Sequence, residues 1–110
     1  MTSRSPVRAA LVTGAARGIG AATVRALAAA GWAVLATDHC ADDQALPYRL
    51  GRRDELDQLV ACVGAARPDS VQGMVVDVRD PAAMAAAVAE AERRWGGLDA
   101  AVAVAGVIAG

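Results

Sequence analysis

Residues 11–20 read Leu-Val-Thr-Gly-Ala-Ala-Arg-Gly-Ile-Gly, so an apolar run leads into three glycines and then into an alanine-rich segment. This order predicts a strand, a tight turn and a helix. Glycine adopts positive φ without strain and has no Cβ to hold an anion away, so backbone N–H groups and the positive helix end can face a phosphate. The pattern Gly-x-x-x-Gly-x-Gly therefore predicts a nucleotide diphosphate site, and the alternative is a tight connection without a ligand.

A carboxylate further along the chain favours the nucleotide site. Residues 33–37 form a second apolar run, and Asp38 follows about 20 residues after the glycines, where the ribose-binding acid of a dinucleotide site is expected. A nucleoside-triphosphate P-loop needs Gly-Lys-Ser or Gly-Lys-Thr, and this chain contains no lysine.

The length of 110 residues predicts one domain, residues 1–110. A net charge of −1 and eleven scattered arginines give no basic stripe for nucleic acid. Residues 1–6 lack the apolar run of a signal peptide, and no long uncharged apolar stretch follows, so we expect a cytoplasmic protein without a membrane partner. Cys40 and Cys62 have no metal-ligand spacing, which favours reduced, structurally incidental thiols over a disulfide or a metal site.

The rest of the chain alternates between strand and helix patterns. Strands are predicted over residues 8–13, 33–37, 71–76 and 100–105, and helices over 18–30, 54–66 and 81–95. With right-handed crossovers this order predicts an α/β, Rossmann-type fold of three layers, with a parallel sheet in strand order 3-2-1-4. The carboxyl edge of that sheet would gather the glycine turn, Asp38, Asp77 and residues 105–106.

Each predicted helix carries residues that recur on one face. They are Ile19, Thr23, Leu27 and Ala30 in the first helix, Leu56, Leu59, Val60 and Val63 in the second, and Met84, Val88, Ala91 and Trp95 in the third. In the second helix, Asp54, Glu55 and Asp57 fall in the predicted first turn, where the helix dipole favours negative charge.

The connection over residues 39–53 is long, because strand-to-helix loops of this kind usually have about 2–6 residues. Its place beside the ligand edge suggests a lid, and a solvated loop is the equal alternative. His39 is predicted to be a surface side chain, because no acid–base partner is evident. Nothing basic follows Tyr48 at helical spacing to activate it, so packing within the loop is favoured over catalysis.

The glycine turn, Asp38, the pair Asp77-Val78 and the segment from Leu98 to Gly106 together resemble the classical short-chain dehydrogenase/reductase family, over nearly the whole chain. The connection after Asp38 resembles the insertion of the mycofactocin-coupled subgroup. Members of that subgroup hold their nicotinamide cofactor so tightly that it does not exchange, and they pass electrons to the carrier mycofactocin. This resemblance favours a lid over the cofactor for residues 39–53.

The resemblance implies cofactor-binding residues at the carboxyl ends of all four strands. They are Gly14, Arg17, Gly18, Ile19 and Gly20 around the pyrophosphate, Asp38 at the adenosine ribose, Asp77 and Val78 at the adenine, and Ala103, Ala105 and Gly106 on the fourth strand. The family usually has Asn-Asn-Ala-Gly where this chain has Ala103-Val104-Ala105-Gly106. Backbone contacts are expected to persist there, whereas the hydrogen bonds of the asparagine side chains are lost.

Two of these residues bear on the choice of cofactor. A carboxylate at Asp38 binds two ribose hydroxyls and repels a 2′-phosphate. Arg17 favours NADP instead, because a basic residue before the middle glycine accompanies NADP use in some relatives. We give Asp38 the greater weight and predict NAD over NADP.

The family transfers hydride between an alcohol or carbonyl substrate and the cofactor, with tyrosine, lysine, serine and asparagine groups that follow the fourth strand. Without lysine this chain has no Tyr-x-x-x-Lys pair. We therefore expect the nucleotide-binding front half of such an enzyme, truncated after the fourth strand and without catalytic residues, with homo-oligomers only in the full-length form. The alternatives are a non-catalytic nucleotide-binding module, a split subunit completed by another chain, or a structural protein that kept the fold.

Overall fold

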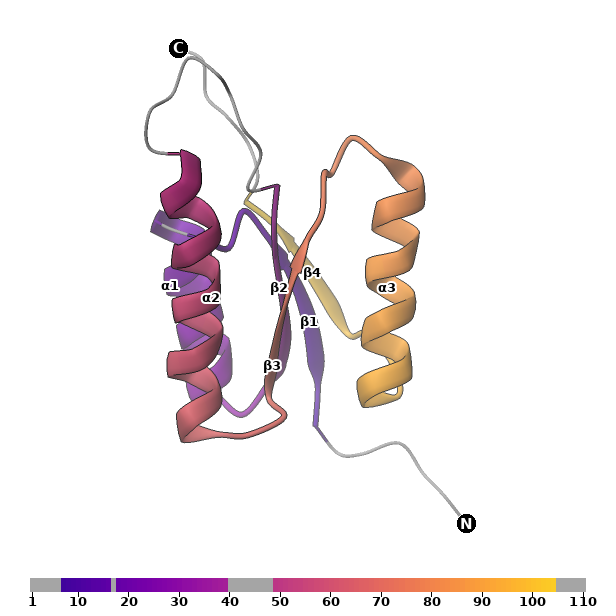
Figure 1. The fold of residues 1–110 in the computed structure, drawn as a ribbon. Helices are drawn as coiled ribbons and strands as arrows, with labels where there is room; N and C mark the ends of the chain where they lie inside the picture. Colours follow the sequence, from indigo (N-terminus) through magenta and orange to yellow (C-terminus); the bar gives the residue numbers. More distant parts are fainter. Residues whose placement is uncertain (1–6, 17, 40–48, 105–110) are drawn as a thin grey trace.

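The computed structural model describes residues 7–16, 18–39 and 49–104. Strands β1 (Ala9–Thr13), β2 (Ala33–Asp38), β3 (Val71–Val75) and β4 (Ala100–Ala103) form one parallel sheet in the order β3-β2-β1-β4. Helices α1 (Gly18–Ala29), α2 (Arg49–Ala66) and α3 (Pro81–Trp95) alternate with the strands (Figure 1). The predicted fold class and strand order are therefore confirmed.

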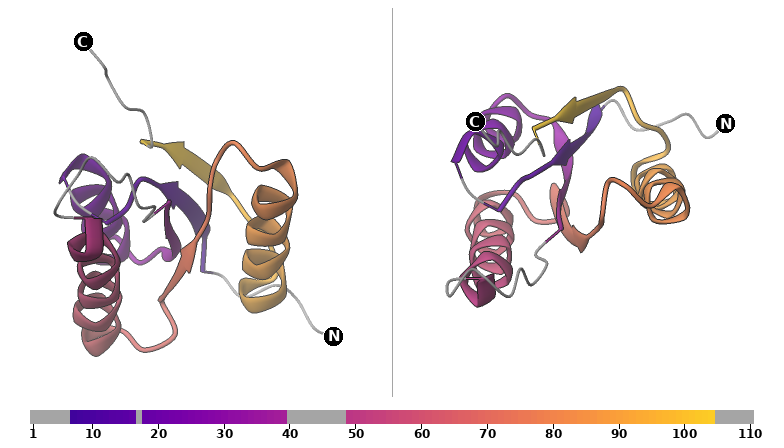
Figure 2. Two further views of the ribbon diagram at one scale, coloured as in Figure 1. Left: turned by 45° about the horizontal axis from the view of Figure 1, so that its top comes forward. Right: turned by 90° about the horizontal axis from the view of Figure 1, so that it is seen from above.

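The helices lie in two layers, with α1 and α2 on one face of the sheet and α3 on the other (Figures 1 and 2). The central strands β1 and β2 are buried along their whole length, which explains why they read as continuous apolar runs. Val12 and Val34 pack toward α1 and α2, whereas Leu11 and Leu35 pack toward α3. This alternation gives the sheet one apolar cluster on each face.

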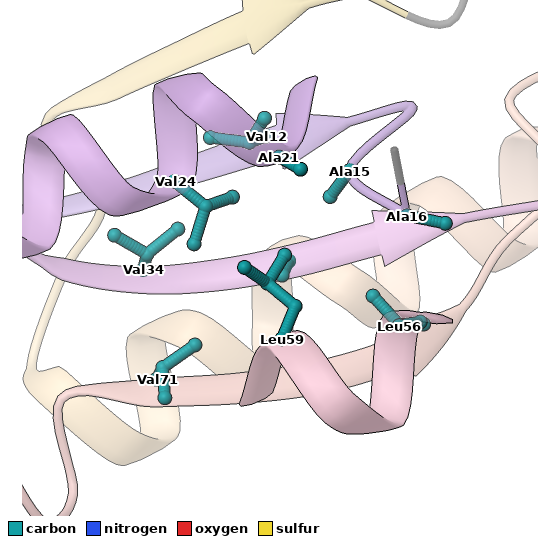
Figure 3. Close-up of a cluster of buried hydrophobic side chains, with 10 residues drawn as sticks. Val12, Ala15, Ala16, Ala21, Val24, Val34, Leu56, Leu59 and Val71 are labelled. Carbon is teal, nitrogen blue, oxygen red and sulfur yellow. The ribbon is translucent and has the colours of Figure 1, made fainter. Parts of the chain in front are cut away.

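Helix α1 packs through a face that only partly matches the predicted one, because Leu27 packs against the apolar cluster as predicted whereas Ile19 does not. Ala21, Val24 and Ala28 are buried against the sheet, and Figure 3 shows Ala21 and Val24 directed into the cluster around Val12. Ile19 is 75% exposed. The cause is a close backbone contact at the start of α1, described below, which sets the rotation of the helix and leaves Ile19 at the surface.

The far end of α1 is closed as its glycine predicts. Gly31 has a φ of 97°, and the N–H groups of Gly31 and Trp32 donate to the carbonyls of Ala28 and Leu27 in a Schellman arrangement. Arg67 follows α2, and its guanidinium donates to the Ala28 carbonyl at 2.8 Å. The cation at the negative end of the α1 dipole ties the two helices of this layer together.

Helix α2 begins at Arg49, earlier than the predicted start at residue 54. Residues 49–53, which we expected in the connection, are therefore helical, and Asp54, Glu55 and Asp57 lie beyond the first turn. Arg53 would be the N-cap of a helix that starts at residue 54, and arginine is not a preferred capping residue, so the sequence there does not stop the helix from extending toward its N-terminus. Residues 40–48 lie outside the described part, and with them Cys40 and Tyr48.

The packing face of α2 is the predicted one. Leu56 and Leu59 are buried, and Val60 and Val63 pack against the same cluster. Gly73 on β3 makes room for them, because a Cβ there would lie 2.9 Å from Val60 Cγ2.

Helix α3 confirms both predicted boundaries. Asp80 is its N-cap and accepts hydrogen bonds from the N–H groups of Ala82 and Ala83 at 3.0 and 3.3 Å. Gly96 closes the other end with a φ of 83°. On the packed face, Ala91 and Trp95 are buried as predicted.

Some general features concern only the described residues. Within them Cys62 is an exposed free thiol, and no group of three His, Cys, Asp or Glu side chains is arranged to hold a metal ion. None of the helices in this part of the chain has the length and apolar character needed to cross a membrane.

Candidate functional site

The turn between β1 and α1 is built on glycines that other residues cannot replace. Gly14 and Gly18 have φ of 67° and 62°, in the left-handed region that side chains with a Cβ rarely adopt. A Cβ at Gly20 would lie 1.8 Å from the Gly14 carbonyl oxygen. The first turn of α1 therefore rests directly on the backbone of the loop, and this contact sets the rotation of the helix.

The same turn is open on its outer side. A Cβ built at Gly18 meets no atom of the described residues within 4 Å, and Gly18 itself is exposed at the start of α1. The first N–H groups of a helix have no intrahelical partners. The turn thus presents donors and the positive end of a helix dipole to open space, an arrangement suited to an anion.

Asp38 joins the end of β2 to this turn. Its side chain is 2% exposed, and Oδ2 accepts a hydrogen bond from the Ala16 N–H at 3.0 Å. One residue away, the Ala15 N–H donates to the Thr37 carbonyl at 2.9 Å. The side chains of Ala15 and Ala16 point into the apolar cluster beneath (Figure 3). A buried carboxylate is thereby held by main chain on a loop that is itself anchored in the core.

Asp77 occupies the connection between β3 and α3. Its Oδ1 accepts from the Arg79 N–H at 2.9 Å and from Arg79 Nε at 3.0 Å, and its Oδ2 accepts from Nη2 at 3.0 Å. These bonds from Arg79 lower the pKa of the Asp77 carboxyl to about 2. The carboxylate is ionised at every pH at which the protein would ordinarily be handled.

His39 has a partner that the sequence did not reveal. Its Nε2 lies 3.2 Å from Asp77 Oδ2, and the two side chains are 42% and 31% exposed. The Val76 N–H donates to the Asp38 carbonyl at 2.9 Å, so the backbone brings the ends of β2 and β3 together. The expectation that His39 has no partner is therefore wrong, whereas its predicted place at the surface agrees with a side chain that is partly exposed.

The end of β4 is joined to β1 by a threonine. Thr13 Oγ1 accepts a hydrogen bond from the Val104 N–H at 3.1 Å and donates to the Val102 carbonyl at 3.4 Å. This link is made by a side chain of β1. Ala103 is the exposed last residue of β4.

The predicted site residues fall into three groups. The structure brings together Gly14, Gly18, Gly20 and Asp38 around the turn. Exposed or partly exposed residues form the second group, with Ile19 on α1, Asp77 and Val78 after β3, and Ala103 at the end of β4. Arg17, Ala105 and Gly106 lie outside the described residues.

Three contributors to this edge were missed from the sequence. The Ala16 N–H carries no signal, because any non-proline residue supplies it. Arg79 stands two residues after Asp77, a spacing that permits the observed chelate in a turn. Thr13 directly precedes the glycines, and a buried hydroxyl at a strand end could have been assigned a cross-strand bond.

Comparison with protein families decides the relationship. The model of the family described as "short chain dehydrogenase" matches residues 8–110. The chain belongs to the short-chain dehydrogenase family. Among the curated relatives of this short-chain dehydrogenase, the protein named "Monensin polyketide synthase putative ketoacyl reductase" from Streptomyces virginiae is 42% identical over 99 residues, which are 88% of this chain and 32% of the relative.

Two solved structures show the same fold with a cofactor. Carveol dehydrogenase from Mycobacterium avium in complex with NAD has a TM-score of 0.81 and 33% identity, over 96% of this chain and 38% of that one. A short chain dehydrogenase from Mycobacterium paratuberculosis bound to NAD has a TM-score of 0.80 and 37% identity. The match covers 91% of this chain and 37% of that one. The short-chain dehydrogenase chain spans about a third of the length of the curated relatives it matches.

The residues present fit a nicotinamide dinucleotide. The open, positively polarised turn at Gly14 and Gly18 suits a diphosphate, and the carboxylate of Asp38 at the next strand end suits vicinal ribose hydroxyls. When bound, such a cofactor supplies a hydride donor or acceptor, chemistry that protein side chains lack.

Proposed function

We propose that this chain is the NAD-binding part of a short-chain oxidoreductase that transfers hydride between a small alcohol or carbonyl substrate and the cofactor. The observation that carries the proposal is the Asp38 carboxylate, held by the Ala16 N–H next to an open glycine turn. A structural protein that had only kept the fold would have no need of a buried carboxylate at this strand end, because burial of a charge is costly.

The chain's own residues would bind and orient the cofactor. The main chain from Gly14 to Gly20, with Arg17 beside it, would hold the diphosphate, and the exposed Ile19 would cover it. Asp38 would accept hydrogen bonds from the adenosine ribose, Asp77 and Val78 would border the adenine, and Ala103, Ala105 and Gly106 would support the cofactor from β4.

The charge at Asp38 supports NAD over NADP. A 2′-phosphate would place negative charge against a carboxylate that is already buried and cannot turn away without losing its bond to Ala16. Arg17 is the residue that would favour NADP. Because Asp38 would contact the ribose itself, we expect its repulsion of a 2′-phosphate to outweigh the attraction of Arg17.

The reacting groups would come from outside these 110 residues. The family's Tyr-x-x-x-Lys pair requires a lysine, and this sequence has none. We propose that a longer form of the protein or a partner subunit supplies this pair together with the substrate pocket, and that homo-oligomers form in that complete state.

We further propose coupling to mycofactocin, with residues 39–53 as a cover that retains the cofactor. The support is the length of the connection between β2 and α2, which exceeds the usual turn even after residues 49–53 are counted in the helix. The test is to denature purified protein after extensive dialysis and assay the released nucleotide. NAD released in near-stoichiometric amount supports retention, and a nucleotide that dialyses away freely contradicts it.

The proposed function is tested by calorimetric titration of the purified protein, freed of bound nucleotide, with NAD and with NADP. We expect NAD to bind more tightly, and Asp38→Asn to weaken NAD binding about tenfold while narrowing the preference over NADP. Asp54→Asn on the exposed side of α2 is the matched control and should leave both affinities unchanged. Tighter binding of NADP would overturn the cofactor assignment, and no binding of either would overturn the function.

A further inference from the structure

His39 stands between the two acids that the proposed site assigns to the adenosine half of the cofactor. It directly follows Asp38 in the chain, and its Nε2 lies 3.2 Å from Oδ2 of Asp77. The backbone bond from Val76 to the Asp38 carbonyl holds the two strand ends at this separation. The imidazole therefore links the end of β2, where the proposed ribose-binding acid lies, to the proposed base-binding acid after β3.

The Asp77 carboxylate is held from two sides. Arg79 approaches both oxygens, and His39 approaches Oδ2 from the end of β2. With a neutral imidazole, the charges of Asp77 and Arg79 cancel. With a protonated imidazole, the group carries a net positive charge and gains a charge-assisted contact to Asp77. Histidine is the side chain whose charge ordinarily changes between about pH 5 and pH 8.

We propose that His39 positions the Asp77 carboxylate for the adenosine half of NAD, and that protonation of its imidazole tightens cofactor binding as the pH falls. The inference rests on the proposed function and deepens it. Two effects act in the same direction. The protonated imidazole fixes the base-binding carboxylate before the cofactor arrives, and its positive charge attracts the anionic diphosphate of the ligand.

The charged groups on the neighbouring connections are Asp38, Asp80 and Arg79. Among the described residues, the Asp38 side chain accepts from the glycine turn, and the Asp80 side chain accepts from the first N–H groups of α3. Arg79 donates to both oxygens of the shared carboxylate, including the Oδ2 atom that His39 approaches. Within this part of the chain, Asp77 is thus the acid that a charged His39 meets.

The first test compares the affinity for NAD at about pH 6 and about pH 8 in the wild type and in His39→Gln, which keeps an N–H donor but cannot take up charge. Because the pair is partly exposed, we expect wild-type binding to be about twofold to fivefold tighter at the lower pH. His39→Gln should show no such slope. An equal slope in both proteins, or none in the wild type, overturns the role of His39 while leaving the proposed function standing. Absence of NAD binding at both pH values overturns both.

The second test locates the effect on the cofactor and does not need a variant. The 110-residue chain has one histidine, so its imidazole C–H signals in proton NMR report on His39 directly. We expect ADP-ribose to shift these signals and to reproduce the pH slope of NAD, and nicotinamide mononucleotide to do neither. Signals that respond to nicotinamide mononucleotide, or to neither fragment, would overturn the assignment to the adenosine half.

Discussion

The carboxyl edge of the sheet is built in two different ways. At its centre, the ends of β1 and β2 meet in a buried arrangement of main chain, where Gly20 rests on Gly14 and the Ala16 N–H holds Asp38. At its side, the connection from β3 to α3 is exposed and depends on charged side chains, where Arg79 and His39 hold Asp77. The centre tolerates almost no change in backbone shape, whereas the charge of the side can change with pH.

The two regions would contribute differently to a cofactor site. Backbone donors on a rigid turn are already oriented before a ligand binds, so their contribution does not depend on solution conditions. Exposed ion pairs contribute little to stability, but they respond to pH and salt. Substitutions at the centre should therefore lower the stability of the fold. Substitutions at the side should mainly change how the site responds to pH and salt.

The largest effect is expected from Gly20→Ala. The added Cβ would lie 1.8 Å from the Gly14 carbonyl oxygen, and backbone on both sides leaves no flexible group to move. We expect a loss of about 3 kcal/mol in the free energy of unfolding, measured by urea denaturation, together with loss of NAD binding.

A second glycine provides the control for this prediction. Gly64 lies inside α2, and a Cβ there would meet Val71 Cγ1 at 3.6 Å, an ordinary contact. Gly64→Ala should stabilise the protein by about 0.5–1 kcal/mol, since alanine is the better helix former. Equal stability of the two variants would show that the β1–α1 contact does not constrain the fold.

The next effect concerns the link from the centre to β4. Thr13→Val removes the hydroxyl and leaves the Val104 N–H and the Val102 carbonyl without this partner. We expect a loss of about 1–2 kcal/mol in the free energy of unfolding. Thr13→Ser keeps the hydroxyl and should retain most of the stability, so an equal loss in both variants would assign the effect to packing of the methyl group instead.

The sequence was sufficient for the centre of the site and insufficient for its side. Positive φ and close approach each demand glycine, so the turn at Gly14 and Gly18 could be predicted from spacing alone. The rotation of α1 could not, because it depends on how Gly20 meets Gly14 in three dimensions. The contact between His39 and Asp77 depends on the register of β2 against β3, which no local pattern specifies.

Capping at Asp80, in the connection from β3 to α3, gives the third prediction. Asp80→Ala removes the acceptor for the N–H groups of Ala82 and Ala83 and should cost about 1 kcal/mol in thermal or urea unfolding. Asp80→Asn keeps an equally good cap and should be close to the wild type. A matching loss in Asp80→Asn would mean that the charge, not the cap, stabilises α3.

The smallest effect is expected at Arg79. The folded pKa of Asp77 is lowered from 3.8 to about 2, chiefly by Arg79, so its contribution to stability is present above 3.8 and is lost as the pH falls toward about 2. Arg79→Gln should raise the pKa of Asp77 toward its ordinary value, as measured by carbon NMR of the carboxyl group, and should flatten this acid-induced loss. An Asp77 pKa that is the same in Arg79→Gln and in the wild type would contradict the role of Arg79 in lowering it.

The central claim is that the turn from β1 to α1 cradles a dinucleotide whose adenosine ribose is held by Asp38. The most direct measurement is a crystal structure of the protein with NAD bound. The account predicts the diphosphate against the main chain of residues 14–20 and the ribose hydroxyls within hydrogen-bond distance of the Asp38 carboxylate. NAD bound elsewhere on the molecule, or with its ribose away from Asp38, would contradict it.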